Sequence, residues 1–587
     1  GIHHWINGTV GLGHCMLQTT PESLQERQPL ANETGDLVLT FDGRVDNRDE
    51  LRAALESKGA RLRDDTDAEL VLHAYECWGK DCFPRLLGPF ALVMYDKREQ
   101  HVVLARDALG DRTLFYHYVP YRHLLVASEE QAILAHPAVT RRVKESAIAS
   151  FLAVDAPILD SSFFQGIEEL APAHVITVST SAFSNRCYWQ LNTSARIHYR
   201  SDQDYADHFL SVLMESVRCR LRSLSPPTVM MSGGMDSTSV AALAARELAK
   251  DRHQPPLRTL SWVFDTLTKC DERWYIEMMT VRYQTRAIFF PGDNEWPLRD
   301  VDTWPVCPNT PLQNAYRWLK ERLYRTAQAL GHRVVLTGLF SDEAYTGDEQ
   351  WLADYWREKR LGKACRETAL HFYRQGVHDS VRDPGLRCLA ALILARVPFF
   401  QRLRQRRSAQ YPPWLTPYAR QHLPPPVEVL GDPRRRHQYL QSMGPTASQN
   451  ATQEIYYASR CGIELWHPYR DRRLLEFMLA IPAYQLFSHR SKHVLRTAMK
   501  GFVPEPIRER EHSTSLLPLF VHGILEREGK KVREIVYARD ALWPRYVKAE
   551  WVKKVLTEDL PCGVDGPASV LPWQCLSLEL WMQQGTL

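Results

Sequence analysis

Two adjacent glycines, Gly233 and Gly234, mark the point where an apolar run ends and an alanine-rich helical pattern begins. The segment around them is VMMSGGMDST, at 229–238, and the helical pattern extends to about residue 248. Paired glycines let backbone N–H groups turn toward an anion, and the start of the following helix carries a partial positive charge. The sequence therefore predicts a strand, a phosphate-binding turn and a helix, with Ser232 and Ser237 beside the glycines.

Asp236 supplies this turn with a carboxylate, the kind of ligand that a magnesium ion takes beside substrate phosphates. A cation held there would neutralise a pyrophosphate leaving group while the turn binds it. The Gly-Lys-Ser/Thr sequence of a Walker loop is absent from the segment. A tight strand-to-helix turn without a ligand is the alternative for the Ser-Gly-Gly triplet alone, but the full SGGMDS segment favours a nucleotide site.

The segment SGGMDS after a strand resembles the pyrophosphate loop of ATP-pyrophosphatases of the asparagine synthetase kind, which adenylate a carboxylate. The resemblance implies an α/β fold with a C-terminal parallel-sheet domain of the PP-loop, adenine nucleotide α-hydrolase-like type at 205–587. It also implies ATP and Mg²⁺ as cofactors. It places the following residues around the nucleotide: Met230, Ser232, Gly233, Gly234, Asp236, Ser237, Ser261, Phe264 and Gly338. For Ser261 and Phe264, near the end of a predicted strand over 257–264, an ordinary strand end is the alternative.

A third predicted strand, at 334–338, leads into the segment LFSDE at 339–343. Parallel α/β sheets place their ligands at such strand ends. The resemblance implies that Asp342 shares the magnesium ion with Asp236. Leu339 stands where some relatives carry a polar catalytic residue, and Phe340 replaces the usual glycine. The sequence therefore leaves the identity of the general base open.

A lysine near the end of the chain completes the expected site. SKHVLR at 491–496 resembles the lysine-bearing helix of the family, in which the lysine faces the ATP phosphates and the developing oxyanion. Fixed positive charge in a closed site is the largest single contribution to such a reaction. The resemblance thus implies Lys492, Asp236 and Asp342 as catalytic residues, and a solvated helical lysine is the alternative.

Two other segments of the C-terminal region have more than one interpretation. Asp271 and Glu272 are either favourable charges in the first turn of a helix or, by the resemblance, residues near the active centre. His467 lies in ELWHPYRD at 464–471, which resembles the PFLD segment of the family, and we expect it to be structural.

The first 180 residues contain short alternating or apolar runs separated by turn residues, which predict a mainly antiparallel layer. Helical patterns intervene at 48–57 and 67–78. Ordered segments such as GLGH at 11–14, FDGRVDNRDEL at 41–51 and ARDALGDRTLFY at 105–116 resemble the glutaminase-type N-terminal domain of asparagine synthetases. The resemblance implies an Ntn-type αββα sandwich at 1–195, a degenerate glutamine amidotransferase-like domain.

This region departs from glutamine-using relatives at the residues that bind glutamine. Met16 stands where an arginine grips the glutamine carboxylate, and Asp42 precedes Gly43 where an Asn-Gly pair is usual. A thioether cannot bind a carboxylate as a guanidinium does. Only Asp67 stands where the family has its acidic ligand for the substrate amine. Cys15 lies inside a predicted strand and is a poor nucleophile candidate. We therefore expect no glutamine hydrolysis.

The segment TTPES at 19–23 resembles the β-lactam synthetase and lasso-peptide cyclase branch, and the end of the chain, WQCLSLELW at 573–581, resembles lasso cyclases. The resemblance implies ATP-dependent macrolactam formation in a lasso precursor peptide, between an Asp or Glu side chain and the N-terminal amine. It also implies a leader-binding protein and a cysteine leader peptidase as partners. An ammonia-dependent asparagine synthetase, another small-molecule amide synthetase and a non-catalytic pseudo-synthetase remain alternatives.

Composition excludes several other classes. A formal net charge of +4 over 587 residues gives no reason to expect a nucleic-acid partner, and arginine runs at 402–407 and 434–436 are expected to be solvated. We find no membrane-length apolar run and no secretory signal, and the twelve cysteines lack CxxC pairs, so we expect a cytoplasmic protein. The sequence assigns no chemistry to 347–449, and it leaves open whether a segment precedes Gly1.

Overall fold

The structure is a computed structural model that describes residues 1–154, 162–303, 307–311, 314–346, 351–358, 360–375, 411–425, 435–488, 490–557 and 570–583. The arginine run at 402–407 lies outside these residues, as does much of the tract 347–449. None of the described helices is both long and apolar enough to cross a bilayer.

The N-terminal region is built on a six-stranded antiparallel sheet, in the order β11-β10-β6-β5-β4-β3. Helices α1 (Arg48–Ser57) and α2 (Asp67–Trp78) pack on one face, where Leu37, Leu39 and Phe41 meet the apolar side of α2. All seven residues of β5 are buried because the other face is also covered. The strands are β3 (Leu30–Ala31), β4 (Leu37–Gly43), β5 (Phe90–Asp96), β6 (His101–Arg106), β10 (His174–Ser179) and β11 (Phe183–Cys187).

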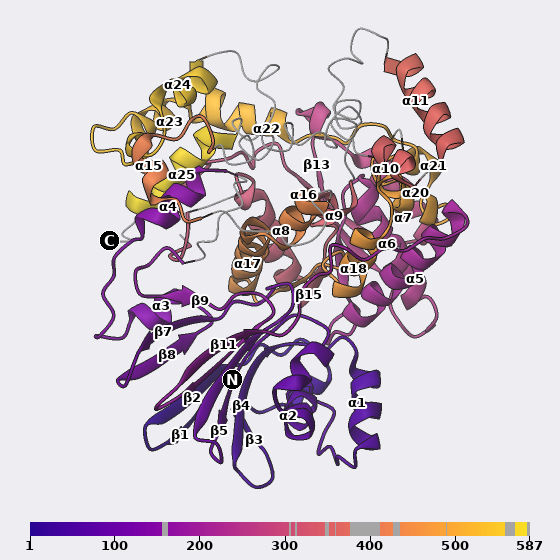
Figure 1. Ribbon diagram of the computed structural model, residues 1–587. Coiled ribbons are helices and arrows are strands. Elements are labelled where there is room, and N and C mark those ends of the chain that lie inside the picture. The colour runs from indigo at the N-terminus through magenta and orange to yellow at the C-terminus, as the bar shows by residue number, and fades with distance from the viewer. Residues whose placement is uncertain are drawn as a thin grey trace.

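Two smaller antiparallel sheets lie against the second face of this sheet. Ala91, Val93 and Leu104 pack there with side chains of the pair β1-β2 and of the sheet β8-β7-β9. Figure 1 shows these strands together at the bottom of the molecule, with α1 and α2 on the opposite face of the six-stranded sheet. The predicted αββα order itself stays a prediction. The remaining elements are β1 (Ile2–Asn7), β2 (Val10–Cys15), β7 (Phe115–Val119), β8 (His123–Ala127), β9 (Glu168–Glu169) and α3 (Glu130–Leu134).

The C-terminal region contains the predicted parallel sheet, in the order β14-β13-β12-β15-β16. The chain runs outward from β12 in one direction through β13 and β14, then returns to pair β15 on the other side of β12. Ligands of parallel α/β sheets bind at the carboxyl ends of strands where the order reverses in this way. The strands are β12 (Thr228–Met230), β13 (Arg258–Val263), β14 (Arg286–Pro291), β15 (Val334–Leu336) and β16 (Glu464–Trp466).

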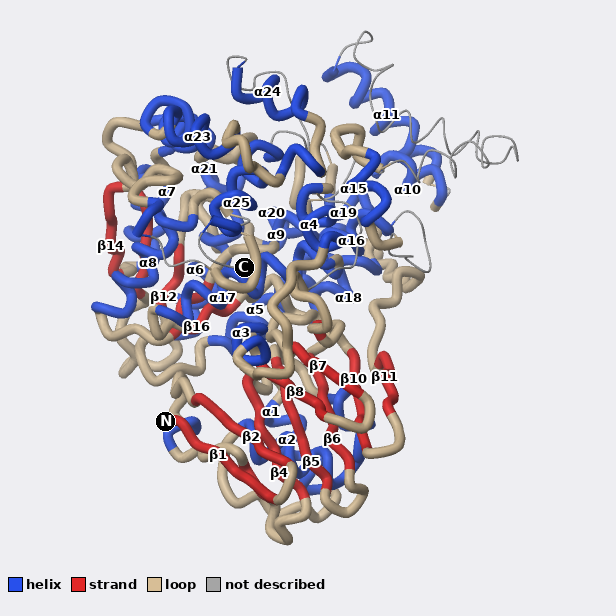
Figure 2. The backbone as a smooth tube through the Cα atoms, turned by 90° about the vertical axis from the view of Figure 1, so that its left-hand side faces the viewer, coloured by secondary structure: helices blue, strands red, loops and turns tan. Residues whose placement is uncertain are grey.

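Helices cover both faces of this sheet because successive strand residues point to opposite sides. Val229 of β12 packs into a core with α5, α6, α18 and α20, while Met230 packs on the other face with α8 and α17. Figure 2 shows helices in front of and behind these strands. Their bounds are α5 (Asp202–Arg220), α6 (Met235–Leu248), α7 (Arg273–Tyr283), α8 (Arg317–Ala329), α17 (Pro445–Arg460), α18 (Arg472–Ala480) and α20 (His493–Ala498).

A third core joins the end of the chain to the N-terminal region. Helix α25 (Leu571–Gln583) packs on α4 (Glu145–Leu152), and Trp581 lies edge-on to Phe163 at a ring distance of 5.2 Å. Other described helices are α9 (Ser341–Tyr345), α10 (Trp351–Arg357), α11 (Leu361–Gln375), α15 (Pro417–His422), α16 (Arg436–Met443), α19 (Ala483–Leu486), α21 (Glu505–Arg508), α22 (Leu517–Val521), α23 (Gly529–Val536) and α24 (Ala549–Thr557).

Candidate active site

The glycine turn connects β12 directly to α6, as the sequence predicts. Two side-chain hydroxyls close it: the N–H of Ser232 donates to Ser237 Oγ at 3.0 Å, and the N–H of Gly234 donates to Ser232 Oγ at 3.2 Å. Helix α6 starts at Met235, so its first backbone N–H groups point toward the turn. The turn and helix together offer the donors and partial positive charge that bind a phosphate.

Gly338 lets the segment after β15 approach the start of α6. A Cβ atom at this position would lie 2.5 Å from the Ser237 nitrogen and 2.8 Å from its Cα, which is closer than Cβ atoms pack. The residues after β15 therefore lie directly against the glycine turn. This contact brings the predicted residue Asp342 to the same place as Asp236.

Lys492 joins the two aspartates through its ammonium group. Its Nζ lies 2.6 Å from Asp236 Oδ2 and 2.7 Å from Asp342 Oδ1. The Ser341 hydroxyl donates to the other Asp236 oxygen at 2.7 Å. The structure thus brings together the three residues that the sequence analysis proposed as catalytic, although they are separated by more than 100 residues each.

The position of Lys492 differs in detail from the prediction. The residue precedes α20 instead of lying on it, and its backbone adopts the left-handed conformation with φ of +61°. Such conformations cost energy in residues with a Cβ atom, and they concentrate at functional sites. The turn that this conformation forms at Lys492 points its side chain back toward the carboxyl ends of β12 and β15.

The three charged groups differ in their exposure to solvent. The Lys492 side chain is 9% exposed and that of Asp236 is 20% exposed, whereas Asp342 is 80% exposed. Burial acts to lower the pKa of Lys492, but Asp236 and Asp342 outweigh it and raise that pKa. Lys492 is therefore an ammonium ion at neutral pH. Burial raises the pKa of Asp236, against the effect of Lys492.

The donor set at this point fits a magnesium ion. Mg²⁺ binds proteins through one or two carboxylates and completes its coordination with substrate phosphates and water. Asp236 and Asp342 supply hard carboxylate oxygens that share one cation already, the Lys492 ammonium, and the exposed side of Asp342 faces solvent. Among the described residues, no group of three or more His, Cys, Asp or Glu side chains forms a metal cage, so substrate oxygens would have to complete the coordination.

The side chains of three other predicted nucleotide residues are engaged elsewhere. Met230 and Phe264 are buried in two apolar clusters. The Ser261 hydroxyl is buried and donates to the Met231 carbonyl at 2.7 Å. These contacts stabilise the sheet, and a role in the adenine pocket stays a prediction for all three.

The positions that raised the question of the general base are apolar or buried. Phe340 has φ of +68°, a conformation that favours the glycine usual at this position in the family. Its ring lies 4.8 Å from that of His467, edge to face, and 4.9 Å from the Arg470 guanidinium carbon. Burial, followed by the charge of Arg470, lowers the pKa of His467 well below its ordinary value. His467 also bonds Thr337 through Nδ1 at 2.7 Å, which fits the expected structural role.

Sequence patterns missed Ser341 and Tyr469 as neighbours of the site. The Tyr469 hydroxyl donates to the Asp236 carbonyl at 3.3 Å, and Ser341 donates to its side chain. The only available signal was that each residue lies inside a segment already matched to the family, LFSDE or ELWHPYRD.

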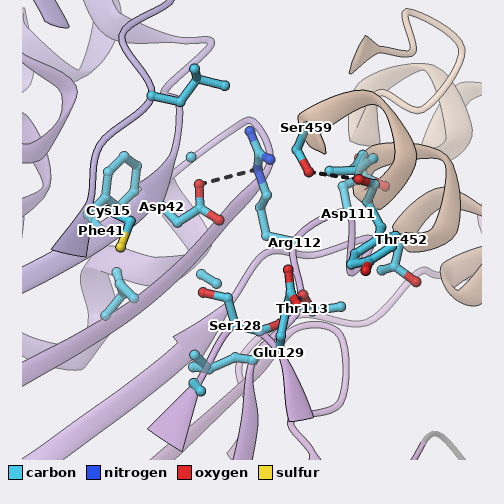
Figure 3. Close-up of a pocket in the computed structure, with 18 of the residues that line it drawn as sticks. Cys15, Phe41, Asp42, Asp111, Arg112, Thr113, Ser128, Glu129, Thr452 and Ser459 are labelled. Carbon is cyan, nitrogen blue, oxygen red and sulfur yellow. Dashed lines mark hydrogen bonds and ion pairs between the residues drawn. The ribbon is translucent and has the colours of Figure 1, made fainter. Parts of the chain in front are cut away.

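A second candidate site is a cavity of about 810 Å³ between the two regions. Figure 3 shows Cys15, Phe41 and Asp42 on one side of it and Thr452 and Ser459 on the other. Arg112 lies in its centre, 3.8 Å from Asp42, and it also pairs with Glu464 of the synthetase region. Thr19, from the TTPES segment, donates to the other oxygen of Glu464 at 2.6 Å.

Asp67, the expected amine ligand of a glutamine site, is already paired in the structure. Arg48 lies 2.7 Å from one of its oxygens, and Arg222 lies 2.6 Å from the other. Arg222 follows α5 and so belongs to the C-terminal region. Burial acts to raise the pKa of Asp67, but Arg222 and Arg48 hold it below its ordinary value. The carboxylate therefore acts as a clamp between the regions.

Comparison with protein families identifies the class to which this architecture belongs. A model described as asparagine synthase matches residues 208–583, and one described as a glutamine amidotransferase domain matches residues 1–189. The chain belongs to the asparagine synthase family, and it is an asparagine synthetase-like, ATP-dependent, amide-forming enzyme. The predicted membership of the asparagine synthetase family is thus confirmed, with a glutamine amidotransferase domain followed by an asparagine synthase domain, while the lasso cyclase branch stays a prediction.

Curated relatives are distant but extend over most of the chain. The asparagine synthetase [glutamine-hydrolyzing] 3 of Bacillus subtilis is 25% identical over 83% of this chain and 77% of the relative. The amidase chyE of Penicillium rubens is 25% identical over 95% of this chain and 88% of the relative. The amidase chry2 of Gibberella zeae is 25% identical over 85% and 80%, respectively.

Proposed function

We propose that this enzyme closes a macrolactam ring in a lasso precursor peptide. In the proposed reaction an Asp or Glu side-chain carboxylate attacks the α-phosphorus of ATP, and pyrophosphate leaves. The N-terminal amine of the same peptide then attacks the acyl-adenylate, and AMP leaves. One water is lost from the peptide in total, and the peptide supplies both the acid and the amine.

The pairing of Asp67 is the observation that carries this proposal. In an enzyme that takes nitrogen from glutamine, this carboxylate must receive the substrate amine, but here Arg48 and Arg222 occupy both of its oxygens. Met16 and Asp42 further remove the groups that would bind the glutamine carboxylate and amide. We infer that the amine comes from another source, and a peptide N-terminus meets that need.

The synthetase site supplies the charge that adenylation requires. The Lys492 ammonium is held in place by two aspartates, so it can stabilise the negative charge that develops on the phosphates and on the acyl oxygen without reorganising. The glycine turn and the start of α6 would bind the pyrophosphate oxygens. Asp236 and Asp342 would hold a magnesium ion, which neutralises the leaving group when bound.

Ring closure within one peptide makes a strong base less necessary. Once acid and amine belong to the same molecule, the effective concentration of the amine can reach about 10⁵ M or more. Leu339 offers no proton-transfer group beside the site, so we propose that the amine arrives neutral. A leader-binding protein and a cysteine leader peptidase are the partners in this proposal, because the N-terminal amine must first be released.

A second candidate is an ammonia-dependent asparagine synthetase or another small-molecule amide synthetase. The names of the relatives favour it, since they include a glutamine-hydrolysing asparagine synthetase and two amidases. The same adenylation site would serve both reactions. The two candidates differ in which molecules supply the acid and the nitrogen.

Mass spectrometry of a peptide substrate separates the candidates. The enzyme would be incubated with ATP, magnesium and a peptidase-processed core peptide encoded beside its gene, with and without the leader-binding and peptidase proteins. Loss of one water per peptide with an equal amount of AMP supports ring closure. An unchanged peptide, together with AMP formed from aspartate and ammonia, would instead establish the small-molecule synthetase.

A further inference from the structure

Glu272 and Arg510 flank the glycine turn and take no part in the chemistry above. Glu272 immediately precedes α7, and Arg510 follows α21. The N–H of Gly233 donates to Glu272 Oε2 at 3.0 Å. Arg510 Nη1 donates to the other oxygen, Glu272 Oε1, at 2.7 Å, and to the Gly233 carbonyl at 3.3 Å. One ion pair thus contacts both polar groups of the same glycine.

The surroundings hold both side chains close to the turn. Glu272 is 14% exposed and Arg510 is 13% exposed. The guanidinium of Arg510 lies over the Tyr275 ring at 4.2 Å, a distance suited to a cation–π contact. A Cβ atom at Gly233 would lie 2.8 Å from Tyr275 Cβ and 2.9 Å from Glu272 Cβ. Glycine is therefore needed here so that the turn can touch the start of α7.

The chemistry of this contact is that of an anion site. The Gly233 N–H is among the donors that a paired-glycine turn offers to a phosphate. A guanidinium is the side chain best suited to bind a phosphate through two parallel hydrogen bonds. In this structure a carboxylate holds both groups, and it does so with the same kind of acceptor atoms that a phosphate presents.

We propose that Arg510 is a phosphate-binding residue and that Glu272 competes with the phosphate for it. On binding, a phosphate oxygen would take the Gly233 N–H, and the Arg510 guanidinium would exchange the carboxylate for the phosphate. The nucleotide would then lie between two cations, Lys492 and Arg510. This inference rests on the proposed function, in which the turn binds the pyrophosphate part of ATP.

The alternative is that the ion pair permanently stabilises the turn. The two interpretations predict opposite changes in pyrophosphate affinity when Glu272 is substituted. With exchange, Glu272→Gln keeps a carbonyl oxygen for the Gly233 N–H but frees Arg510, so pyrophosphate binds about threefold or more tightly than to the wild type. Arg510→Gln removes a charged phosphate donor, so binding weakens roughly tenfold or more. With permanent stabilisation, both substitutions loosen the turn and both weaken binding.

Isothermal titration calorimetry with magnesium pyrophosphate, and separately with magnesium ATP, measures these affinities without turnover. Arg508→Gln is the matched control, because it removes an arginine two positions away that pairs with Glu505 and Glu509. Its affinity should equal that of the wild type. Thermal unfolding of each variant checks that the fold is kept, and Arg510→Lys, which keeps the charge without the planar donor pair, should bind with intermediate affinity.

The possible outcomes distinguish a failure of this inference from a failure of the proposed function. Tighter binding by Glu272→Gln with weaker binding by Arg510→Gln supports exchange. Weaker binding by both, or no change in either while the wild type binds, would overturn the exchange but leave the adenylation proposal intact. A wild-type protein that binds neither ligand would overturn both.

Discussion

The ammonium group of Lys492 is the point where three distant parts of the chain meet. It satisfies one oxygen of Asp236 and one of Asp342, and both aspartates in turn raise its pKa. Removing Lys492 would leave the carboxylates of Asp236 and Asp342 close together without a cation, which is costly because Asp236 is mostly buried. The three residues therefore act as a unit, and the free-energy effects of substituting them should not be additive.

Replacement of Lys492 by Met should reduce ATP–pyrophosphate exchange by roughly 10² to 10³, because it removes a fixed charge that stabilises the transition state. Asp236→Ala should abolish exchange, since it removes both a partner of Lys492 and a proposed magnesium ligand. Exchange would be measured with radiolabelled pyrophosphate and the natural acid substrate. Ser341→Ala is the control, because it removes one hydrogen bond to Asp236 and keeps the charges. Retained exchange in Asp236→Ala would contradict the site assignment.

At the scale of elements, the junctions after β12 and β15 decide how the site is built. The start of α6 and the segment after β15 come into backbone contact at Gly338. Neither element carries the site by itself, since Asp236 lies on one and Asp342 on the other. A single methyl group inserted between the start of α6 and the segment after β15 would move the two carboxylates apart.

Gly338→Ala should therefore impair the enzyme more than an alanine normally does. Its Cβ atom would lie 2.5 Å from backbone of α6, so the segment after β15 must shift, and we expect exchange to fall at least tenfold. Gly362→Ala, where no atom lies within 4 Å of the new Cβ, is the matched control. It should leave exchange unchanged. Equal activity in the two variants would show that the close contact is unimportant.

Much of this element-level description follows from local sequence. Apolar runs and helical periodicity predict α1 and α2 with the bounds found, and the glycine pair predicts the change from strand to helix at 229–238. Lys492 was expected on a helix but precedes it, because a left-handed backbone has no periodic signal. The contacts of Glu272 with Gly233 and of Arg222 with Asp67 join segments far apart in sequence, and no local pattern encodes them.

At the scale of the whole molecule, the two regions are joined by charged groups as well as by apolar contacts. Arg222 reaches from the C-terminal region to Asp67, and Arg112 reaches in the other direction to Glu464. Arg44 also donates to the Cys219 carbonyl at the end of α5. The N-terminal region is thus fixed to the synthetase region through buried groups.

The pairing of Asp67 makes the stability of the enzyme depend on pH. Its pKa is lower in the folded protein, so the pairing stabilises the fold above the ordinary pKa of 3.8, and this contribution is lost as the pH falls through the lower folded value. Arg222→Gln should therefore lower the urea midpoint at pH 7, by the equivalent of about 1–3 kcal/mol. The difference from the wild type should shrink near pH 3. A difference that stays constant across this range would argue against the clamp.

The same clamp predicts that glutamine is not a nitrogen donor. Glutamate release from glutamine should stay at the level of a protein-free blank, with or without ATP. Met16→Arg restores the missing carboxylate ligand but should not restore hydrolysis, because Arg48 and Arg222 still occupy Asp67. Glutamate release above the blank by either protein, measured by chromatography, would contradict the proposed source of the amine.

The packing of α25 on α4 has a consequence for the order in which the protein folds. The apolar face of α4, at 145–152, packs against α15 at 417–422 and α25 at 571–583, more than 250 and more than 400 residues later. On a ribosome, that face emerges long before the helices that cover it. We therefore expect the N-terminal region to keep part of this apolar surface exposed until synthesis has passed α15 and reached α25, because contacts so distant in sequence form late and slowly. We expect a chain of this design to need protection from aggregation during synthesis.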